Sequence, residues 1–196
     1  MTLPVLVLLF PPFFFFALII FFASFRRIGP NEVGLITKRF SLKKLVNDNP
    51  VAFNGEPGYQ AEMLMPGLRW KLCLVYKVEK FPWVQIQAGQ IGVVISQIGK
   101  PLPIGSKSAV YKKEFANFTD LKSFVNGGGE KGVQRTVLPP GSLLPLHPAA
   151  FLVITKNKVY GLPLSPEFKT KMGKEGLKPE MFGLRPQQLD LVRIEP

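Results

Sequence analysis

The 196-residue chain is poor in reactive and metal-binding side chains: it contains one cysteine and one histidine. A single cysteine excludes an intramolecular disulfide. One residue of each type also leaves no cluster of soft ligands for a structural zinc site. We therefore expect no metal, and no motif points to a cofactor.

Acidic residues are also scarce. The chain has 13 Asp and Glu against 25 Lys and Arg, which gives a formal net charge of +12. Such a surface suits anionic lipid, and it also suits nucleic acid. No helix-turn-helix, zinc finger or aromatic RNA-binding motif is present, so we expect membrane lipids with anionic headgroups as partners and no nucleic acid.

Charge is absent from the first 25 residues, which are almost wholly apolar from Leu3 to Phe25. A helix of that length spans about 34 Å, enough for a hydrocarbon core of roughly 30 Å. We expect residues 1–27 to form a transmembrane anchor with its basic flank, kinked near Pro11 and Pro12. The anchor residues are Leu3, Phe10, Phe14, Ile19 and Phe25.

Two alternatives to a spanning anchor remain open. A cleaved signal peptide requires basic residues before the apolar run and a small-x-small exit site, and both are poorly represented here. An interfacial or re-entrant hairpin bent at the two prolines is the other.

Positive charge begins at Arg26 and Arg27, only on the C-terminal flank of the apolar run. The positive-inside rule then predicts a single-pass protein of a bacterial inner membrane, with its N-terminus outside and the remainder in the cytoplasm. We expect the headgroup-facing residues to be Arg26, Arg27, Lys38, Arg39 and Trp70.

Beyond the flank, short β-branched and apolar segments alternate with Pro and Gly. They predict strands at 32–38, 72–81, 84–87, 91–95 and 150–155. A short helix is expected after a Thr119 cap, ending at Asn126 and Gly127. The predicted fold class is α+β and β-dominated. Residues 164–196 are expected to form a connector, with a possible further strand starting at Leu189.

The β-rich part repeats itself. Gly58-x-Gln60-x-x-x-Leu64-x-Pro66-Gly67 recurs as Gly132-x-Gln134-x-x-x-Leu138-x-Pro140-Gly141. Equal spacing predicts two similar β modules, residues 28–86 and 87–163, the second carrying an insertion at 104–131. Pro followed by Gly suits a type II turn, so Pro66–Gly67 and Pro140–Gly141 are predicted to occupy equivalent turns.

The order of these motifs resembles the SPFH, or band 7, superfamily of stomatins, prohibitins and flotillins. The first unit carries the resemblance in the segment Ile28 to Ile36 and in Met65-Pro66-Gly67-Leu68-Arg69-Trp70-Lys71. The second unit is similar to large bacterial flotillin-like members through Phe124-Val125-Asn126-Gly127-Gly128-Gly129 and Leu138-x-Pro140-Gly141. His147-Pro148 stands where that pattern has Asn-Pro.

The resemblance implies a membrane-anchored scaffold. Such proteins assemble with copies of themselves or with relatives into rings or cages, and they organise a membrane microdomain and its client proteins. The long coiled coil of the family has no counterpart here, because the chain contains no heptad repeat. Alternatives are a periplasmic adaptor of a membrane-fusion assembly, or a membrane-tethered part of a larger protein whose activity lies beyond Pro196.

No catalytic set emerges from the sequence. The glycine-rich run from Gly127 to Gly132 lacks the Ser or Thr that follows the lysine of a phosphate loop. His147 has no nucleophile in pattern beside it. We therefore expect a protein that is not an enzyme and has no catalytic residues.

Overall fold

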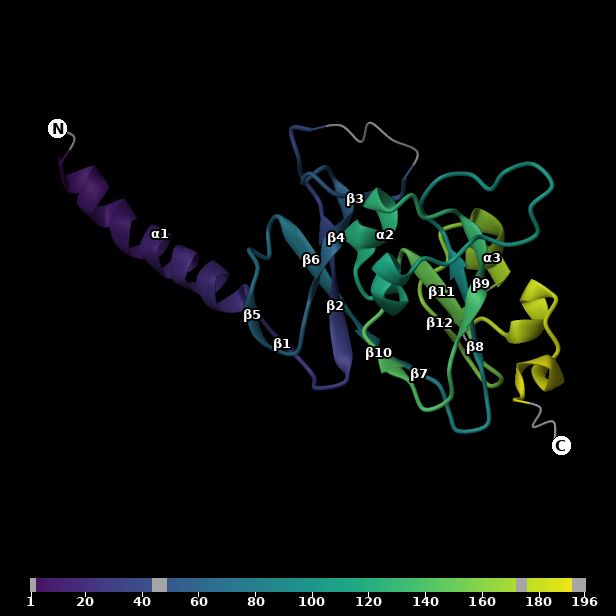
Figure 1. Ribbon diagram of the computed structural model, residues 1–196. Coiled ribbons are helices and arrows are strands. Elements are labelled where there is room, and N and C mark those ends of the chain that lie inside the picture. The colour runs from purple at the N-terminus through teal and green to yellow at the C-terminus, as the bar shows by residue number, and fades with distance from the viewer. Residues whose placement is uncertain (1–2, 44–48, 172–175, 192–196) are drawn as a thin grey trace, which may run out of the picture.

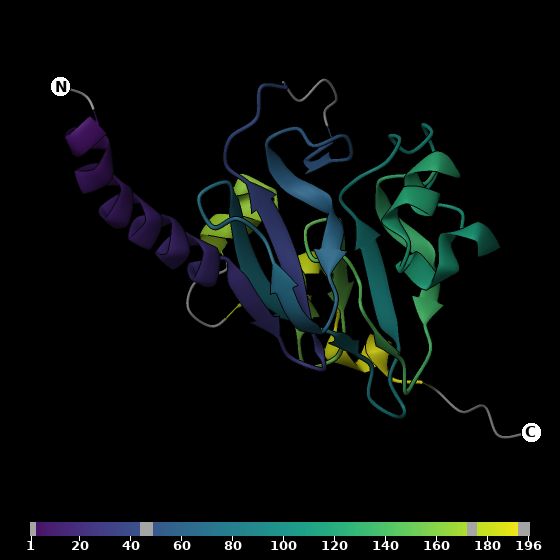
Figure 2. The same ribbon diagram turned by 90° about the vertical axis from the view of Figure 1, so that its left-hand side faces the viewer.

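The computed structural model describes residues 3–43, 49–171 and 176–191, with side chains of the N-terminal helix from Pro12 onward. The described chain is β-rich, with three α-helices: α1 (Leu3–Ala23), α2 (Leu121–Asn126) and α3 (Pro166–Lys171). Helix α1 projects from the β-rich body as a separate rod (Figure 1), and a view from the side shows it equally clear of the body (Figure 2).

The first repeat, Phe25 to Pro82, consists of two sheets. Strand β1 (Phe25–Ile28) pairs with β5 (Gly67–Trp70). The larger sheet has the order β3-β4-β2-β6. Its strands are β2 (Glu32–Lys38), β3 (Val51–Ala52), β4 (Gly58–Leu64) and β6 (Tyr76–Pro82).

The second repeat, residues 83–160, has the same two-sheet plan. Strand β7 (Val84–Gln85) pairs with β10 (Leu143–Leu144). The larger sheet has the order β12-β11-β8-β9. Its strands are β8 (Gly92–Ser96), β9 (Gly132–Leu138), β11 (Phe151–Ile154) and β12 (Val159–Tyr160). Strand β12 pairs with β11 at the outer edge of the second sheet. In the first repeat β6 has the position of β11, and no described strand pairs with its outer edge.

Strand register repeats together with strand order. Gly34 lies opposite Leu64 in the first repeat, as Gly92 lies opposite Leu138 in the second. Each pair of strands then has an irregularity at the equivalent point, between Leu35 and Thr37 and between Val93 and Ile95. After it, the pairs Lys38–Gly58 and Ser96–Gly132 face each other. A bulge of this kind twists a strand pair locally, so the two units share their twist as well as their order.

The repeated glutamine explains part of the repeated motif. The Gln60 side-chain amide donates hydrogen bonds to the carbonyls of Glu56 and Gly58, at 2.8 and 2.9 Å. Gln134 donates in the same way to Glu130 and Gly132, at 2.9 and 3.1 Å. In both units the side chain folds back on the first residue of its own strand and on the residue two positions earlier, and it fixes where that strand begins.

The proline–glycine turns also match. Gly67 and Gly141 have φ of +118° and +75°, which residues with a Cβ rarely adopt. Gly67 pairs with Ile28, and the Gly141 amide donates to the carbonyl of Ile86, the counterpart of Ile28. Pro66 and Pro140 precede these glycines, so each turn returns the chain onto the small two-stranded sheet.

The two repeats share one apolar core. Buried Leu35 and Val51 of the first repeat belong to the same cluster as Val94 and Phe151 of the second. The insertion of the second repeat adds a group of buried rings on a 3₁₀ helix, η1 (Lys113–Phe118), and on α2. Phe115, Phe118, Phe124 and Phe151 contact one another with centroids 4.8–6.0 Å apart.

Two predicted boundaries differ from the structure for local reasons. The strand predicted at 72–81 begins only at Tyr76, because the Val75 and Tyr76 amides both donate to the Leu72 carbonyl and close a turn. The helix cap is Asp120, whose carboxylate accepts from the Lys122 and Ser123 amides. These bonds, led by the Ser123 hydroxyl, lower the pKa of Asp120.

The C-terminal segment is ordered along the second sheet. It contains two 3₁₀ helices, η2 (Pro179–Phe182) and η3 (Pro186–Leu189). Leu177 and Leu189 are buried against Ile154 and Val159. Leu189 therefore ends a helical turn rather than starting a strand, and residues 192–196 of the expected strand lie outside the described residues.

The expected transmembrane span is not supported, and with it the predicted single-pass localisation and the fold class built on a spanning helix are corrected. Over the part of the chain that the structure describes, no helix is both long and apolar enough to cross a membrane. Helix α1 ends at Ala23, and Phe25 already belongs to β1.

Candidate functional site

Helix α1 exposes apolar side chains in every direction. Phe13 is 73% exposed and Phe21, nearest the body, is still 47% exposed. Phe14 and Ile19 are exposed as well. The side chains of Leu3 and Phe10 lie outside the described residues. The exposed apolar residues are Phe13, Phe14, Phe15, Phe16, Leu18, Ile19, Phe21 and Phe22.

The junction between α1 and the body is built on Ser24, which is fully buried. Its hydroxyl donates to the Ile20 carbonyl at 2.6 Å and accepts from the Cys73 amide at 3.1 Å. The Ser24 carbonyl accepts from the Lys71 amide at 3.0 Å. The last turn of the helix is therefore bonded to the segment that joins β5 to β6.

Aromatic rings and arginines form a collar at the base of α1, which we define as Phe25, Arg26, Arg27, Arg69 and Trp70. Strands β1 and β5 place Phe25 opposite Trp70 and Arg26 opposite Arg69. The Phe21 ring of α1 lies 5.4 Å from Phe25 and 6.1 Å from Trp70, centroid to centroid.

The collar is basic and open. Arg26, Arg27 and Trp70 are exposed, and the Arg69 guanidinium donates to the carbonyls of Met65 and Pro66. None of the ion pairs found among the described residues involves an arginine of the collar. Positive charge therefore gathers around the foot of an apolar rod.

Lys38 and Arg39, predicted to share the headgroup-facing surface, lie at the end of β2, beside the segment that joins β5 to β6. Lys38 pairs with Tyr76, and the Arg39 amide donates to the Val75 carbonyl at 2.8 Å. Both line an open cleft that includes none of the collar residues.

His147 lies in the interior of the protein. Only 1% of the residue is exposed. Nδ1 accepts from the Ala150 amide at 3.1 Å, so Nε2 carries the proton and donates to the Gln60 carbonyl at 2.9 Å. Burial lowers the pKa of His147 to about 4. This neutral imidazole joins the second repeat to the first.

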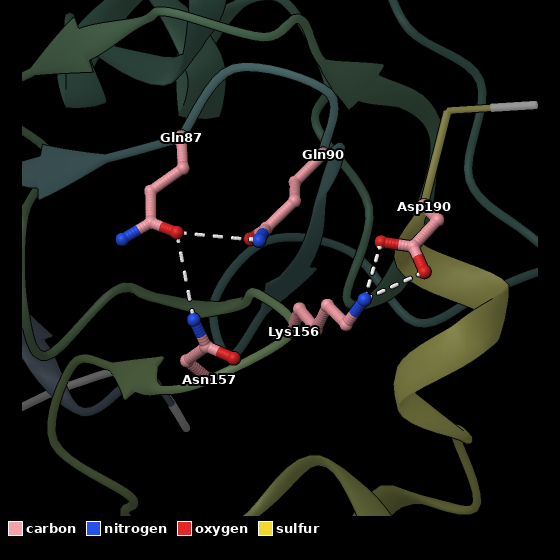
Figure 3. A network of polar contacts seen from close by, with 5 residues as sticks. All are labelled: Gln87, Gln90, Lys156, Asn157 and Asp190. Atoms are coloured by element: carbon pink, nitrogen blue, oxygen red, sulfur yellow. Dashed lines mark hydrogen bonds and ion pairs between the residues drawn. The ribbon is translucent and has the colours of Figure 1, made fainter.

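A polar depression of about 270 Å³ lies beside the β11–β12 hairpin, lined among others by Gln85, Gln87 and Asn157. At its border the Gln87 side-chain oxygen accepts from Gln90 and Asn157, at 3.3 and 3.5 Å (Figure 3). Beside this network Lys156 binds both oxygens of the Asp190 carboxylate, at 2.8 and 2.7 Å. The ion pair ties the C-terminal segment to the second sheet.

Residues suited to catalysis are dispersed. Within the described ranges, no group of three or more His, Cys, Asp and Glu side chains could hold a metal ion. The glycine-rich run is part of the packing instead: a Cβ on Gly129 would meet the Phe124 ring at 2.5 Å, and Gly127 lies against Phe115. These glycines are required by neighbouring rings rather than by a phosphate.

Comparison of the chain with models of known protein families, with curated proteins and with solved structures finds no match. The resemblance to the SPFH superfamily therefore stays a prediction from the motifs.

Proposed function

We propose that this chain is a non-catalytic scaffold of the SPFH type, whose copies assemble side by side against a surface of anionic lipid. The observation that carries the proposal is the exposed apolar rod α1 with the basic, aromatic collar at its foot. The proposal needs lipid contact at the collar and does not need the helix to cross a bilayer.

An apolar helix that is exposed on all sides is stabilised when another apolar surface shields it from water. Helices that are hydrophobic on every side are normally buried, and exposed apolar patches of this kind mark interaction sites. Each apolar side chain removed from water contributes about 1.5–3 kcal/mol. Packing α1 against the same helix of neighbouring copies would cover several phenylalanines per subunit.

The collar has the composition that suits a lipid interface. Each Lys or Arg near an anionic surface adds about 1 kcal/mol of attraction, and Trp is favoured at the headgroup level. Arg26, Arg27 and Arg69 contribute their charges beside exposed Trp70. The bonds of Ser24 hold this group at a fixed position beneath the helix.

The tandem arrangement favours a directional assembly. Two similar repeats joined in one chain present different ends: the collar lies on the first repeat, and the segment containing η2 and η3 lies on the second. A contact between unlike ends must either close into a ring or continue indefinitely. We expect a closed ring of many copies.

The self-association is tested by measuring the mass of the full chain by light scattering and by electron microscopy. Replacing two exposed phenylalanines, F15Q/F22Q, should shift large assemblies to monomers. The control K113Q changes an exposed residue of η1, outside the collar and the segment containing η2 and η3, and should leave the mass unchanged. A wild-type chain that is monomeric at high concentration would overturn the proposal.

The lipid contact is tested by flotation of the full chain with vesicles. Vesicles of phosphatidylserine in phosphatidylcholine should carry the protein more strongly than phosphatidylcholine alone, and R26Q/R27Q should reduce that difference. Equal flotation of the wild type and R26Q/R27Q with anionic vesicles would remove the collar from the proposal.

A further inference from the structure

A second basic surface lies at the C-terminal end of β2. An open cleft with a volume of about 800 Å³ is bordered by residues 38–43 and by Asn54, Gly55 and Pro57. Lys38, Arg39 and Lys43 line it together with Phe40 and Ser41, and no carboxylate is among its lining residues.

The three cations remain available to a ligand. Lys38 Nζ donates to the Gly55 carbonyl at 2.7 Å, and Lys43 Nζ donates to the Asn54 carbonyl at 3.0 Å. An ammonium group has three donors, so each lysine retains donors after these bonds. The ion pairs formed by described lysines involve other lysines, and Arg39 is exposed without one.

One acid lies near this surface. Glu56 accepts hydrogen bonds from the Asn54 amide and side chain, at 2.8 and 3.3 Å. Backbone hydrogen bonds lower its pKa, with a smaller contribution from Lys43. A single ionised carboxylate leaves a net charge of +2 over the four groups, and Glu56 is itself occupied by the loop.

Comparison with the second repeat shows why the cleft is informative. Gly55 borders the cleft, and its counterpart by the repeated spacing is Gly129. A Cβ on Gly129 would meet the Phe124 ring at 2.5 Å, whereas the only neighbour of a Cβ on Gly55 is Lys38 Nζ, at 3.6 Å. Beside the same glycine, one repeat packs a buried ring and the other presents a cation to an open cleft.

Apolar surface adjoins the cations. Phe40 is 71% exposed and Leu42 is fully exposed, both on the border of the cleft. A ligand that matches this border carries several negative charges on one compact group and an apolar or ring-shaped part beside it. Phosphate monoesters carry nearly two charges at neutral pH and three acceptor oxygens, and Arg binds them with two parallel hydrogen bonds.

We infer that this cleft binds a phosphate monoester attached to an apolar group, with Lys38, Arg39 and Lys43 on the phosphate and Phe40 on the apolar part. The shared chemistry admits two sources, a phosphatidic acid headgroup or a soluble organic phosphate. The inference goes beyond the proposed scaffold function, because none of the residues that line the cleft belongs to the collar or to α1.

The test compares two variants of the full chain by titration calorimetry with phenyl phosphate and by flotation with vesicles of phosphatidic acid in phosphatidylcholine. K38Q/R39Q/K43Q should lose binding by at least tenfold, while R26Q/R27Q should bind phenyl phosphate like the wild type. Loss with phenyl phosphate assigns the soluble source, and loss confined to vesicles assigns the lipid. Unchanged binding of both probes by the triple variant, or no binding by the wild type, would overturn the inference.

Two further measurements separate binding from folding. R39Q alone alters an exposed side chain that forms no ion pair with the described residues, and it should still weaken binding severalfold. Thermal unfolding should show that both variants remain folded. Failure of F15Q/F22Q to dissociate the assembly would weaken the scaffold proposal and leave these titrations unaffected, so the two proposals fail independently.

Discussion

The two repeats have the same strand order, the same register and the same glutamine hydrogen bonds. They differ in the side chains that lie beside the larger sheet. In the second repeat the insertion brings Phe115, Phe118 and Phe124 into a buried cluster. In the first repeat the corresponding loop is shorter and presents Lys38, Arg39 and Phe40 to solvent. The shared strands fix the frame, and the loops between them decide whether a unit supplies core or surface.

Phe124→Ala is expected to have the largest effect on this comparison. Its ring contacts Phe115 and Phe151 with centroids 4.8 and 5.1 Å apart, and truncation leaves a cavity in the shared core. The free energy of unfolding should fall by about 3–5 kcal/mol. Phe40→Ala is the control: it removes an exposed ring and should change stability by about 0.5 kcal/mol or less. Urea denaturation measures both, and equal losses would contradict the assignment of core to one repeat.

Lowering the pH should weaken the contact that joins the repeats at His147. The pKa of the folded imidazole is about 4, against 6.5 for the ordinary side chain. The unfolded chain therefore takes up the proton first as pH falls, and stability that is complete above pH 6.5 is lost between 6.5 and 4. The loss amounts to about 3 kcal/mol.

The control for this titration is His147→Leu. Leu72 is the counterpart of His147 in the first repeat, because each carbonyl accepts from the amides three and four residues later. The variant should be less stable than the wild type at pH 7, because the Gln60 carbonyl loses its partner. Its unfolding free energy should vary less between pH 6.5 and 4. A pH dependence identical to that of the wild type, followed by denaturation at each pH, would assign it to other groups.

The matched pair Gln60→Ala and Gln134→Ala sharpens the comparison further. Each side chain donates two hydrogen bonds to carbonyls at the start of its strand. Gln134 is buried whereas Gln60 is half-buried, so water can replace the lost bonds only in the first repeat. We expect losses of about 1–3 kcal/mol at Gln134 and about 0.5–1.5 kcal/mol at Gln60, measured by urea denaturation. A larger loss at Gln60 would show that solvent access does not govern the difference.

Lys156→Ala should have the smallest effect on global stability. The ion pair with Asp190 is about one-third exposed on both sides, and pairs of this kind contribute about 0.2–1 kcal/mol. Its consequence is local, because only the second repeat carries the C-terminal segment. Amide exchange near Leu189 should accelerate, while amides of β2 exchange as in the wild type. Uniform acceleration in both repeats would refute a local role.

Short-range sequence patterns predict the strands and the repeat. The segment 32–38 is rich in β-branched residues and forms β2 with the predicted bounds. Spacing alone identified the glutamines and the proline–glycine turns as equivalent, and each glutamine bonds carbonyls only two and four residues earlier. Local patterns therefore predict those features whose physical causes are local.

Features with distant causes were missed. Nothing near His147 indicates burial, since its partner Gln60 is 87 residues away. The left-handed turn at Ala116, Asn117 and Phe118, with φ of +46° to +65°, contains no glycine that would signal it. The hydroxyl of Tyr111 stabilises it by accepting from the Asn117 amide. The basic cleft was missed because charge alone does not show which loops border the same space.

The hydrogen bonds of Ser24 fix the orientation of α1 relative to the first repeat. A helix attached through a glycine-rich linker would swivel, and neighbouring subunits could then adopt many spacings. Here the helix end is hydrogen-bonded on both the hydroxyl and the carbonyl of Ser24, and the Phe21 ring lies beside Trp70. Helix α1 is therefore held at a fixed angle to the segment that follows β5, and tilting the helix would strain these hydrogen bonds. Every copy in an assembly would hold its body at one angle to the rod, so curvature would be set by this junction rather than by the partners it meets.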